Sequence, residues 1–202
     1  MNTPRTPNPR RVGVLALQGA FERHAAVLAE LGHEARLVRD AAVFAELDGL
    51  VLPGGESTVQ LELLARLGLE GPLRELARAG RPILATCAGL ILIAARVARP
   101  PQRSFGLLDV EVARNAYGRQ LDSFESVSDE PPQLESTPQA ASATPLPLVF
   151  IRAPRITRVG PGVQVLAHHR GEPVLVREGN ITACSFHPEL TADARVHRAV
   201  FG

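Results

Sequence analysis

One cysteine stands where a catalytic nucleophile would be placed. Cys87 lies in the segment ATCAG (residues 85–89), between a short apolar run at 82–85 that predicts a buried strand and an apolar run at 88–98 that predicts a helix. A tight strand-to-helix turn projects its side chain outward, and the amino terminus of the helix favours a thiolate. An inert buried thiol explains a lone cysteine in an apolar region about as well. Cys184, in the middle of a strand-like run, is interpreted as such a core residue.

A possible base and its orienting group follow the last strand-like run, as His187-Pro188-Glu189. Residues two apart in an extended segment point to the same side, so both side chains can reach one site. His187 could accept the proton of Cys87 while Glu189 orients and charges the imidazole, which is the logic of a triad. Taken alone, a solvated pair near the chain end is the favoured interpretation. A metal site is not indicated, because the sequence shows no further ligands at a suitable spacing.

A glycine pair occupies the end of another strand-like run, in the segment LPGGES at 52–57. Two glycines let the backbone turn so that an N–H points at a ligand. The N–H of Gly55, together with that of Ala88 after the nucleophile, could bind the oxyanion of an acyl-transfer reaction. An ordinary turn in which Ser57 caps the next helix is compatible with this role. A phosphate loop is excluded because no Gly-Lys-Ser/Thr follows.

These segments sit in an alternating pattern of strands and helices. Strand-like runs at 12–17, 36–38, 49–52 and 82–85 alternate with helix-like runs at 20–31, 57–67, 72–79 and 88–98. This alternation predicts a mostly parallel central sheet covered on both faces, in a single three-layer α/β domain. Further strand-like runs at 107–113, 148–151, 163–166, 173–176 and 181–186 have little helix between them and predict an antiparallel extension, before a last helix at 193–201.

Composition limits the remaining choices. The 202 residues are 45% hydrophobic with a net charge of +1, which suits one domain and gives no reason to expect nucleic acid or an anionic membrane as partner. No apolar run approaches the roughly 20 residues that span a bilayer. Two cysteines make no disulfide scaffold, and a cytoplasmic location is expected. We expect a flexible tail at 1–11, an exposed and partly disordered loop at 126–147, and surface positions for His168 and His169.

The amino-acid sequence of these segments resembles that of a known family. Taken together, the three signals are similar to the class I triad glutamine amidotransferases, and more closely to the glutaminase subunit of pyridoxal 5′-phosphate synthase. The resemblance rests on VLALQGA at 14–20, LPGGEST at 52–58, TCAGLI at 86–91, RNAYGRQ at 114–120, SFE at 123–125, VFIRAP at 149–154 and CSFHPELT at 184–191. These blocks run in the family's order from residue 12 to the end of the chain. Ala85 departs from the glycine common before the nucleophile, a minimal change.

The resemblance implies a flavodoxin- or Rossmann-like amidotransferase fold and a glutaminase activity. Cys87 would form a glutamyl thioester, with His187 and Glu189 completing the triad, and the released ammonia would pass to a partner lyase subunit in a large hetero-oligomer that makes pyridoxal 5′-phosphate. No cofactor is implied for this chain. The positions that match the family's glutamine site are Gly55, Glu56, Ser57, Arg114, Ile151 and Arg152.

Two alternatives and one regulatory detail complete these expectations. A related amidotransferase serving another synthase, such as that for imidazole glycerol phosphate, is disfavoured by the RNAYGRQ and VFIRAP blocks. A catalytically dead scaffold is disfavoured by the intact Cys, His and Glu set. Gln18, in the loop after the first strand, is a candidate activation latch, because its amide could hold the Gly54-Gly55 peptide in a flipped orientation.

Overall fold

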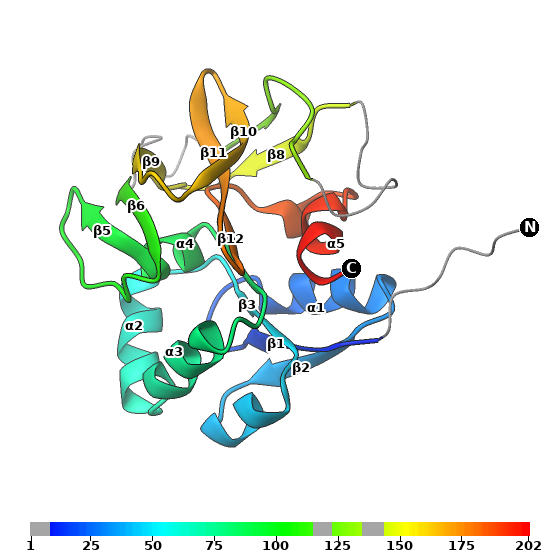
Figure 1. Ribbon diagram of the computed structural model, residues 1–202, viewed down its shortest axis with the longest axis vertical. Coiled ribbons are helices and arrows are strands. Elements are labelled where there is room, and N and C mark those ends of the chain that lie inside the picture. The colour runs from blue at the N-terminus through cyan, green and yellow to red at the C-terminus, as the bar shows by residue number, and fades with distance from the viewer. Residues whose placement is uncertain (1–8, 115–122, 135–143) are drawn as a thin grey trace, which may run out of the picture.

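The centre of the protein is one seven-stranded sheet. The computed structural model describes residues 9–114, 123–134 and 144–202. Its main sheet has the order β10-β11-β12-β4-β3-β1-β2 (Figure 1). The five strands from β12 to β2 are parallel, and β11 and β10 add to them in antiparallel fashion. These strands are β1 (Arg11–Leu15), β2 (Glu34–Val38), β3 (Gly49–Leu52), β4 (Ile83–Thr86), β10 (Gln164–His169), β11 (Glu172–Glu178) and β12 (Ile181–Cys184).

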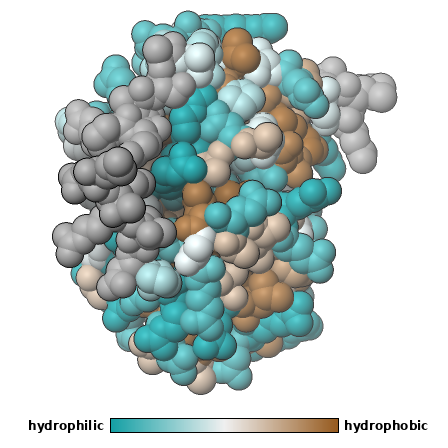
Figure 2. All heavy atoms as spheres, turned by 90° about the vertical axis from the view of Figure 1, so that its right-hand side faces the viewer, coloured by the Kyte–Doolittle hydropathy of each residue, from teal (hydrophilic) through white to brown (hydrophobic). Residues whose placement is uncertain are grey.

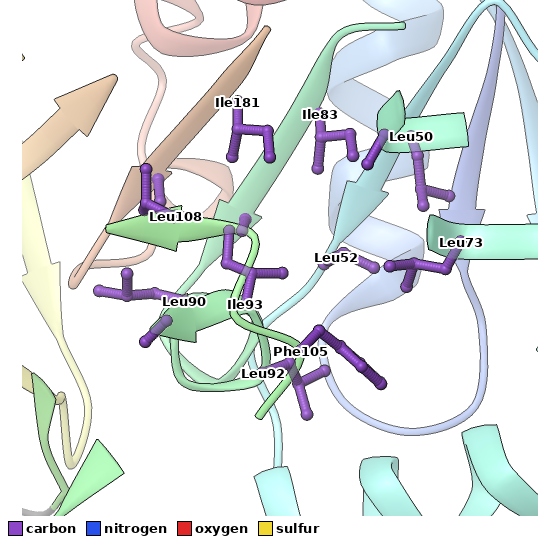
Figure 3. Packing of buried hydrophobic residues seen from close by; sticks show 14 of the residues in the cluster. Leu50, Leu52, Leu73, Ile83, Leu90, Leu92, Ile93, Phe105, Leu108 and Ile181 are labelled. Atoms are coloured by element: carbon purple, nitrogen blue, oxygen red, sulfur yellow. The ribbon is translucent and has the colours of Figure 1, made fainter. Parts of the chain in front are cut away.

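Helices cover both faces of this sheet. On one face lie α1 (Phe21–Glu30) and α5 (Arg195–Phe201), and on the other α2 (Ser57–Arg66), α3 (Glu70–Arg78), α4 (Ala88–Ile93) and the 3₁₀ helix η1 (Ala41–Glu46). Side chains of β3 alternate between two apolar clusters. Val51 packs in the cluster of α1 and α5, whereas Leu50 and Leu52 pack with α3 and α4 (Figure 3). Short, wholly apolar strands such as β3 therefore bury both faces, and the predicted three-layer α/β fold is confirmed.

Two small sheets complete the second half of the chain. One contains β5 (Ala94–Ala98), β6 (Leu108–Ala113) and β9 (Arg155–Val159); the other pairs β7 (Phe124–Val127) with β8 (Pro147–Phe150). The antiparallel extension predicted for this half is confirmed at β11 and β10. The strands β6 and β8, which were expected to join it, instead belong to the separate small sheets.

The helix predicted at 88–98 is wrong beyond Ile93. At Ala94 the backbone becomes extended, with ψ 149°, and β5 pairs in parallel with β6. The pairing buries Val97 and places Arg96 beside Glu111, 3.4 Å away. The apolar run 88–98 fits either a helix or a strand, so partner strands distant in sequence decide where the helix ends.

The loop expected to be exposed at 126–147 is packed at both of its described ends. Leu134 and Leu146 lie in the core with α5, and the Leu146 N–H donates to Ser128 Oγ at 2.9 Å. Residues 135–143 of this segment and residues 1–8 of the expected tail lie outside the described residues, while Arg11 already belongs to β1. His169 is buried against Phe150, so its predicted surface position is wrong; the bulged end of β10 turns its ring inward.

One face of the molecule mixes polar and apolar side chains. Seen from the right-hand side of Figure 1, polar side chains surround small apolar areas (Figure 2). Within the described residues, every helix is too short or too polar to cross a bilayer.

Candidate active site

The predicted chemical groups meet at one edge of the main sheet. Four neighbouring parallel strands, β1, β3, β4 and β12, end there, and within three residues of their ends follow Gln18, Gly54, Cys87 and His187, respectively. The carboxyl ends of parallel strands form the usual binding edge of such a sheet. The fold thus gathers groups that lie as far as 169 residues apart, from position 18 to position 187.

Cys87 stands on a sharp turn between β4 and α4. Its backbone has φ 48° and ψ −102°, a left-handed conformation that is rare for a residue with a side chain. The turn is anchored because the Cys87 N–H donates to Cys184 O at 2.9 Å and Ile91 N–H donates to Cys87 O at 3.3 Å. The Sγ atom lies 3.8 Å from the carbonyl oxygen of Ile151. The predicted strand-to-helix elbow is confirmed, and its strain is typical of the turn that carries a nucleophile.

His187 and Glu189 form a buried pair. The 3₁₀ helix η2 (Pro188–Leu190) begins directly after His187 and brings Glu189 Oε1 to 2.7 Å from His187 Nδ1. Burial lowers the pKa of His187, but hydrogen bonds with Cys87 and Glu189 and the charges of both groups outweigh it and raise the pKa to about 10. The geometry therefore supports an imidazolium beside Cys87 at neutral pH.

Cys184 contrasts with Cys87. It is fully buried in β12, and its Sγ lies 3.3 Å from Phe186 O. Burial first, and then the charges of Glu189 and Cys87, raise the pKa of its thiol well above the ordinary value. The prediction of an inert core thiol is confirmed.

A pocket of about 420 Å³ opens in front of Cys87 and His187. Its wall contains every residue predicted to bind substrate, although the structure by itself does not test those roles. Glu189 lies behind His187, and Ala88 is buried at the first position of α4. The pocket is lined by Gln18, Gly19, Ala20, Gly54, Gly55, Glu56, Ser57, Cys87, Ile91, Arg114, Ile151, Arg152 and His187.

Two opposite charges face each other in this wall. Arg114 Nη2 lies 3.3 Å from Glu56 Oε1, and the Arg114 side chain is only 14% exposed. Glu56 also caps α2, because its Oε2 accepts the Val59 N–H at 2.8 Å. Ser57 is therefore not the cap; its Oγ donates to Gln102 Oε1 at 3.0 Å. The rest of the RNAYGRQ block, 115–120, lies outside the described residues.

The glycine loop is held in one defined position. The Ala20 N–H donates to Gly54 O at 3.2 Å, and the Gly54 N–H donates to Thr86 Oγ1 at 3.0 Å. Gln18 reaches the following peptide, where its Oε1 accepts the Glu56 N–H at 2.6 Å. A Cβ on Gly54 would lie 2.3 Å from the His187 ring, so only glycine lets the loop approach the base this closely.

Three buried residues behind the triad were not predicted. His24 of α1 contacts Glu189, Thr86 of β4 and His197 of α5, at distances of 3.3, 3.2 and 2.8 Å. A signal for His24 was present, since it lies on the same helical face as the apolar residues Phe21 and Leu28. Thr86 and His197 carried no comparable signal, because their neighbours in sequence predict only strand and helix.

A cysteine on a strained elbow, in one site with a buried imidazole–carboxylate pair at the carboxyl edge of a parallel sheet, is the arrangement typical of the amidotransferase class. A solved structure described as a glutamine amidotransferase superimposes with a TM-score of 0.83 at 42% identity, covering 94% of this chain and 96% of that one. PurLQS from Thermotoga maritima shares the fold, with a TM-score of 0.71 at 18% identity and coverage of 95% and 97%.

Sequence comparison is more specific. The chain belongs to the SNO glutamine amidotransferase family, whose profile matches residues 14–201. It is 48% identical to the pyridoxal 5′-phosphate synthase subunit PdxT of Shouchella clausii, covering 94% of this chain and 92% of that protein. The subunit of the same name from Deinococcus radiodurans is 48% identical, with 95% of each chain covered. That of Thermotoga neapolitana is 45% identical, over 93% of this chain and 96% of that protein.

Proposed function

We propose that this chain is the glutaminase subunit of a pyridoxal 5′-phosphate synthase. It hydrolyses L-glutamine to L-glutamate and ammonia, and a partner synthase subunit uses the ammonia to build the pyridoxal ring. The observation that carries the proposal is one pocket lined by Cys87, by His187 and by the Arg114–Glu56 pair. The names of the relatives that cover nearly the full chain supply the synthase assignment.

The substrate's backbone groups match the charges in the pocket wall. Arg114 is suited to pair with the α-carboxylate, because its planar fork can bind a carboxylate bidentately. Glu56, 3.3 Å away from it, is suited to the α-ammonium group. In this arrangement the substrate takes the place of the direct ion pair. Gly55, Ser57, Ile151 and Arg152 complete the pocket around the side-chain amide.

The reaction then follows from the position of the triad. Cys87 Sγ attacks the side-chain amide carbon, and the carbonyl oxygen becomes an oxyanion that the N–H groups of Gly55 and Ala88 stabilise. His187 donates its proton to the leaving nitrogen, so ammonia departs and a glutamyl thioester remains. His187 next takes a proton from water, whose oxygen attacks the thioester and releases glutamate and the thiolate. Glu189 orients the imidazole throughout.

The product cofactor is not required by this chain. Pyridoxal 5′-phosphate forms on the partner subunit in this proposal, so the chain needs only glutamine, water and a surface that delivers ammonia. A large hetero-oligomer with the lyase subunit is the expected assembly.

The first test replaces each cysteine in turn. Cys87→Ala should abolish glutamate release from the reconstituted complex, while circular dichroism and melting temperature stay close to those of the parent. Cys184→Ala is the matched control; it removes the second thiol and should retain activity, because that sulfur contributes packing only. Glutamate release by the Cys87 variant would refute the nucleophile assignment. If the chain is an active glutaminase but its ammonia supports a different synthase, only the assignment of the partner is refuted.

A further inference from the structure

A chain of buried polar side chains continues behind the catalytic pair. His24 and His197 are both completely buried. His24 Nε2 lies 3.3 Å from Glu189 Oε2, and His24 Nδ1 lies 2.8 Å from His197 Nε2. Since His187 occupies the other carboxylate oxygen, Glu189 is contacted from both sides by imidazole rings. Two histidines in an apolar interior cost free energy unless they have polar partners, so their position needs a reason.

The surroundings of His24 favour one tautomer. An ionised carboxylate repels the lone pair of a bare ring nitrogen, so the tautomer that suits Glu189 carries its proton on His24 Nε2. The other nitrogen of His24 then accepts from His197 Nε2–H. The hydrogen bond of His24 Nε2 is with Thr86 Oγ1 at 3.2 Å; Glu189 Oε2, at 3.3 Å, is within ion-pair distance of the same nitrogen and has no hydrogen bond of its own among the described residues.

Burial reinforces this arrangement. Burial first, and then the charges of His197 and His187, lower the pKa of His24 well below its ordinary value, and burial lowers the pKa of His197 to about 4. Both rings are therefore neutral near pH 7, and His24 acts as a neutral donor. Of the described residues, the titratable groups that face it are Glu189 from η2, His197 from α5 and, beyond Glu189, His187.

His24 also reaches the glycine loop. Its Nε2 lies 3.2 Å from Thr86 Oγ1, the same oxygen that accepts the Gly54 N–H at 3.0 Å. At the start of the same helix, the Ala20 N–H donates to Gly54 O. Helix α1 thus contacts both the carboxylate of the triad and the loop proposed to bind the oxyanion.

We propose that His24 is a positioning residue for amide hydrolysis, which holds Glu189 through its second oxygen and, through Thr86, keeps the Gly54 loop in register with the triad. His197 sets the tautomer of His24. The proposal rests on the proposed glutaminase function. The competing explanation is a purely structural pair of core histidines. A metal site is not a competitor, because no three His, Cys, Asp or Glu side chains of the described residues are arranged to hold an ion.

The test follows the reactivity of Cys87 rather than turnover alone. The full-length chain carrying Cys184→Ala has one thiol, and its alkylation by iodoacetamide is measured from pH 4 to pH 9. An N–H group that faces an ionised carboxylate favours the ionised form, and the carboxylate in turn favours the protonated imidazole of His187. His24→Leu should therefore move the acid limb of the alkylation profile to higher pH and lower kcat of the complex about tenfold with little change in KM. His24→Gln, which keeps an N–H group at this position, should restore most of the alkylation profile and most of kcat.

His33→Leu is the matched control. His33 is another buried histidine, at the end of the same helix, but it contacts the backbone of Arg10 rather than the triad. The His33→Leu variant should have a lower melting temperature, but the acid limb of its alkylation profile should not move. If His24→Leu behaves in the same way as His33→Leu, the role is structural and the proposal is wrong.

A double-variant cycle identifies the group through which His24 acts. In a Glu189→Gln background there is no carboxylate to protonate, so adding His24→Leu should no longer move the acid limb. An undiminished shift in that background would overturn the link to Glu189. The alkylation assay needs no substrate, so it still gives an answer if glutamine proves not to be the substrate; the failure of the two proposals can be told apart.

Discussion

At the scale of single residues, the site depends on charges held close together in a partly closed pocket. Arg114 is the clearest case, because its guanidinium is largely buried and already paired with Glu56. Arg114 Nη2 also lies 3.3 Å from Thr58 Oγ1, whereas the Glu56 side chain is 46% exposed and open to a ligand. A zwitterionic substrate that offers both a carboxylate and an ammonium group satisfies both at once, which favours an amino acid over an uncharged amide.

Arg114→Ala should therefore weaken glutamine binding more than it slows chemistry. Losing one charge-assisted interaction raises KM about ten- to a hundredfold, with a smaller fall in kcat. Steady-state glutamate release from the complex measures both constants. Arg158→Ala is the control, since this exposed arginine pairs with Asp109 away from the pocket and should leave KM unchanged. An unaltered KM in the Arg114 variant would contradict the assignment.

His187 leads to a prediction about pH. With its pKa raised to about 10, the imidazole keeps its proton across the neutral range and loses it only as pH approaches that value. A positive charge therefore remains beside Cys87 at pH 7, where it attracts the negative charge that a sulfur carries when it reacts. Alkylation of Cys87 by iodoacetamide should be fast at pH 7 in the parent and slower in His187→Ala, and the difference should shrink above pH 10. Equal rates at pH 7 would show that His187 does not support the thiolate.

At the scale of elements, the start of α1 and the glycine loop form one unit. Gly19 has φ 98°, and a Cβ there would lie 1.8 Å from Gly54 O, far inside van der Waals contact. A side chain at this position must push the loop away from the helix. The loop carries the N–H proposed for the oxyanion, so a local steric change in one element should reach the chemistry in another.

Gly19→Ala should lower kcat strongly, by up to the roughly hundredfold that one lost oxyanion donor costs. Gly32→Ala is a matched control: Gly32 also has positive φ, 82°, but a Cβ there meets nothing within 4 Å. Both variants place a side chain at a positive φ, which strains the backbone and should lower the melting temperature, but only Gly19→Ala should lose activity. Comparable activity in the two variants would remove the steric argument.

At the scale of the whole molecule, activity is expected to depend on the partner. The Gly54 carbonyl accepts from Ala20, while the side chain of Gln18 holds the Glu56 N–H. If the partner docks near this loop, we expect the Gly54-Gly55 peptide to rotate and its hydrogen bond to Ala20 to break. The rotated peptide then offers its N–H to the oxyanion in place of its carbonyl oxygen. We expect the side chain of Gln18, which already bonds the neighbouring Glu56 N–H, to hold the rotated peptide in the role of a latch.

The isolated chain should consequently be a poor glutaminase, and the synthase partner should raise kcat about a hundredfold, the value of one oxyanion donor. Tighter substrate binding would instead lower KM. Glutamate release is measured with and without the partner, and Gln18→Ala should reduce the gain. Equal kcat values in the two conditions would eliminate the peptide rotation.

Much of this protein could be predicted from its sequence because the relevant signals are local. The buried strands β3 and β4 are short apolar runs, and the turns after them are marked by Gly54-Gly55 and by small residues around Cys87. Strand–helix alternation predicts a parallel sheet, and parallel strands bring such turns to a common edge. The position of Cys184 in the middle of a strand-like run likewise predicted that it belongs to the core.

Only the tertiary structure decided the features that depend on partners far along the chain. The end of α4 at Ile93 depends on pairing between β5 and β6, and the burial of Leu134 depends on α5. Contact between His24 and Glu189 joins residues 165 positions apart, from 24 to 189. No local pattern encodes such contacts, since a residue's own helix or strand determines which face it occupies but not which distant side chain packs against that face.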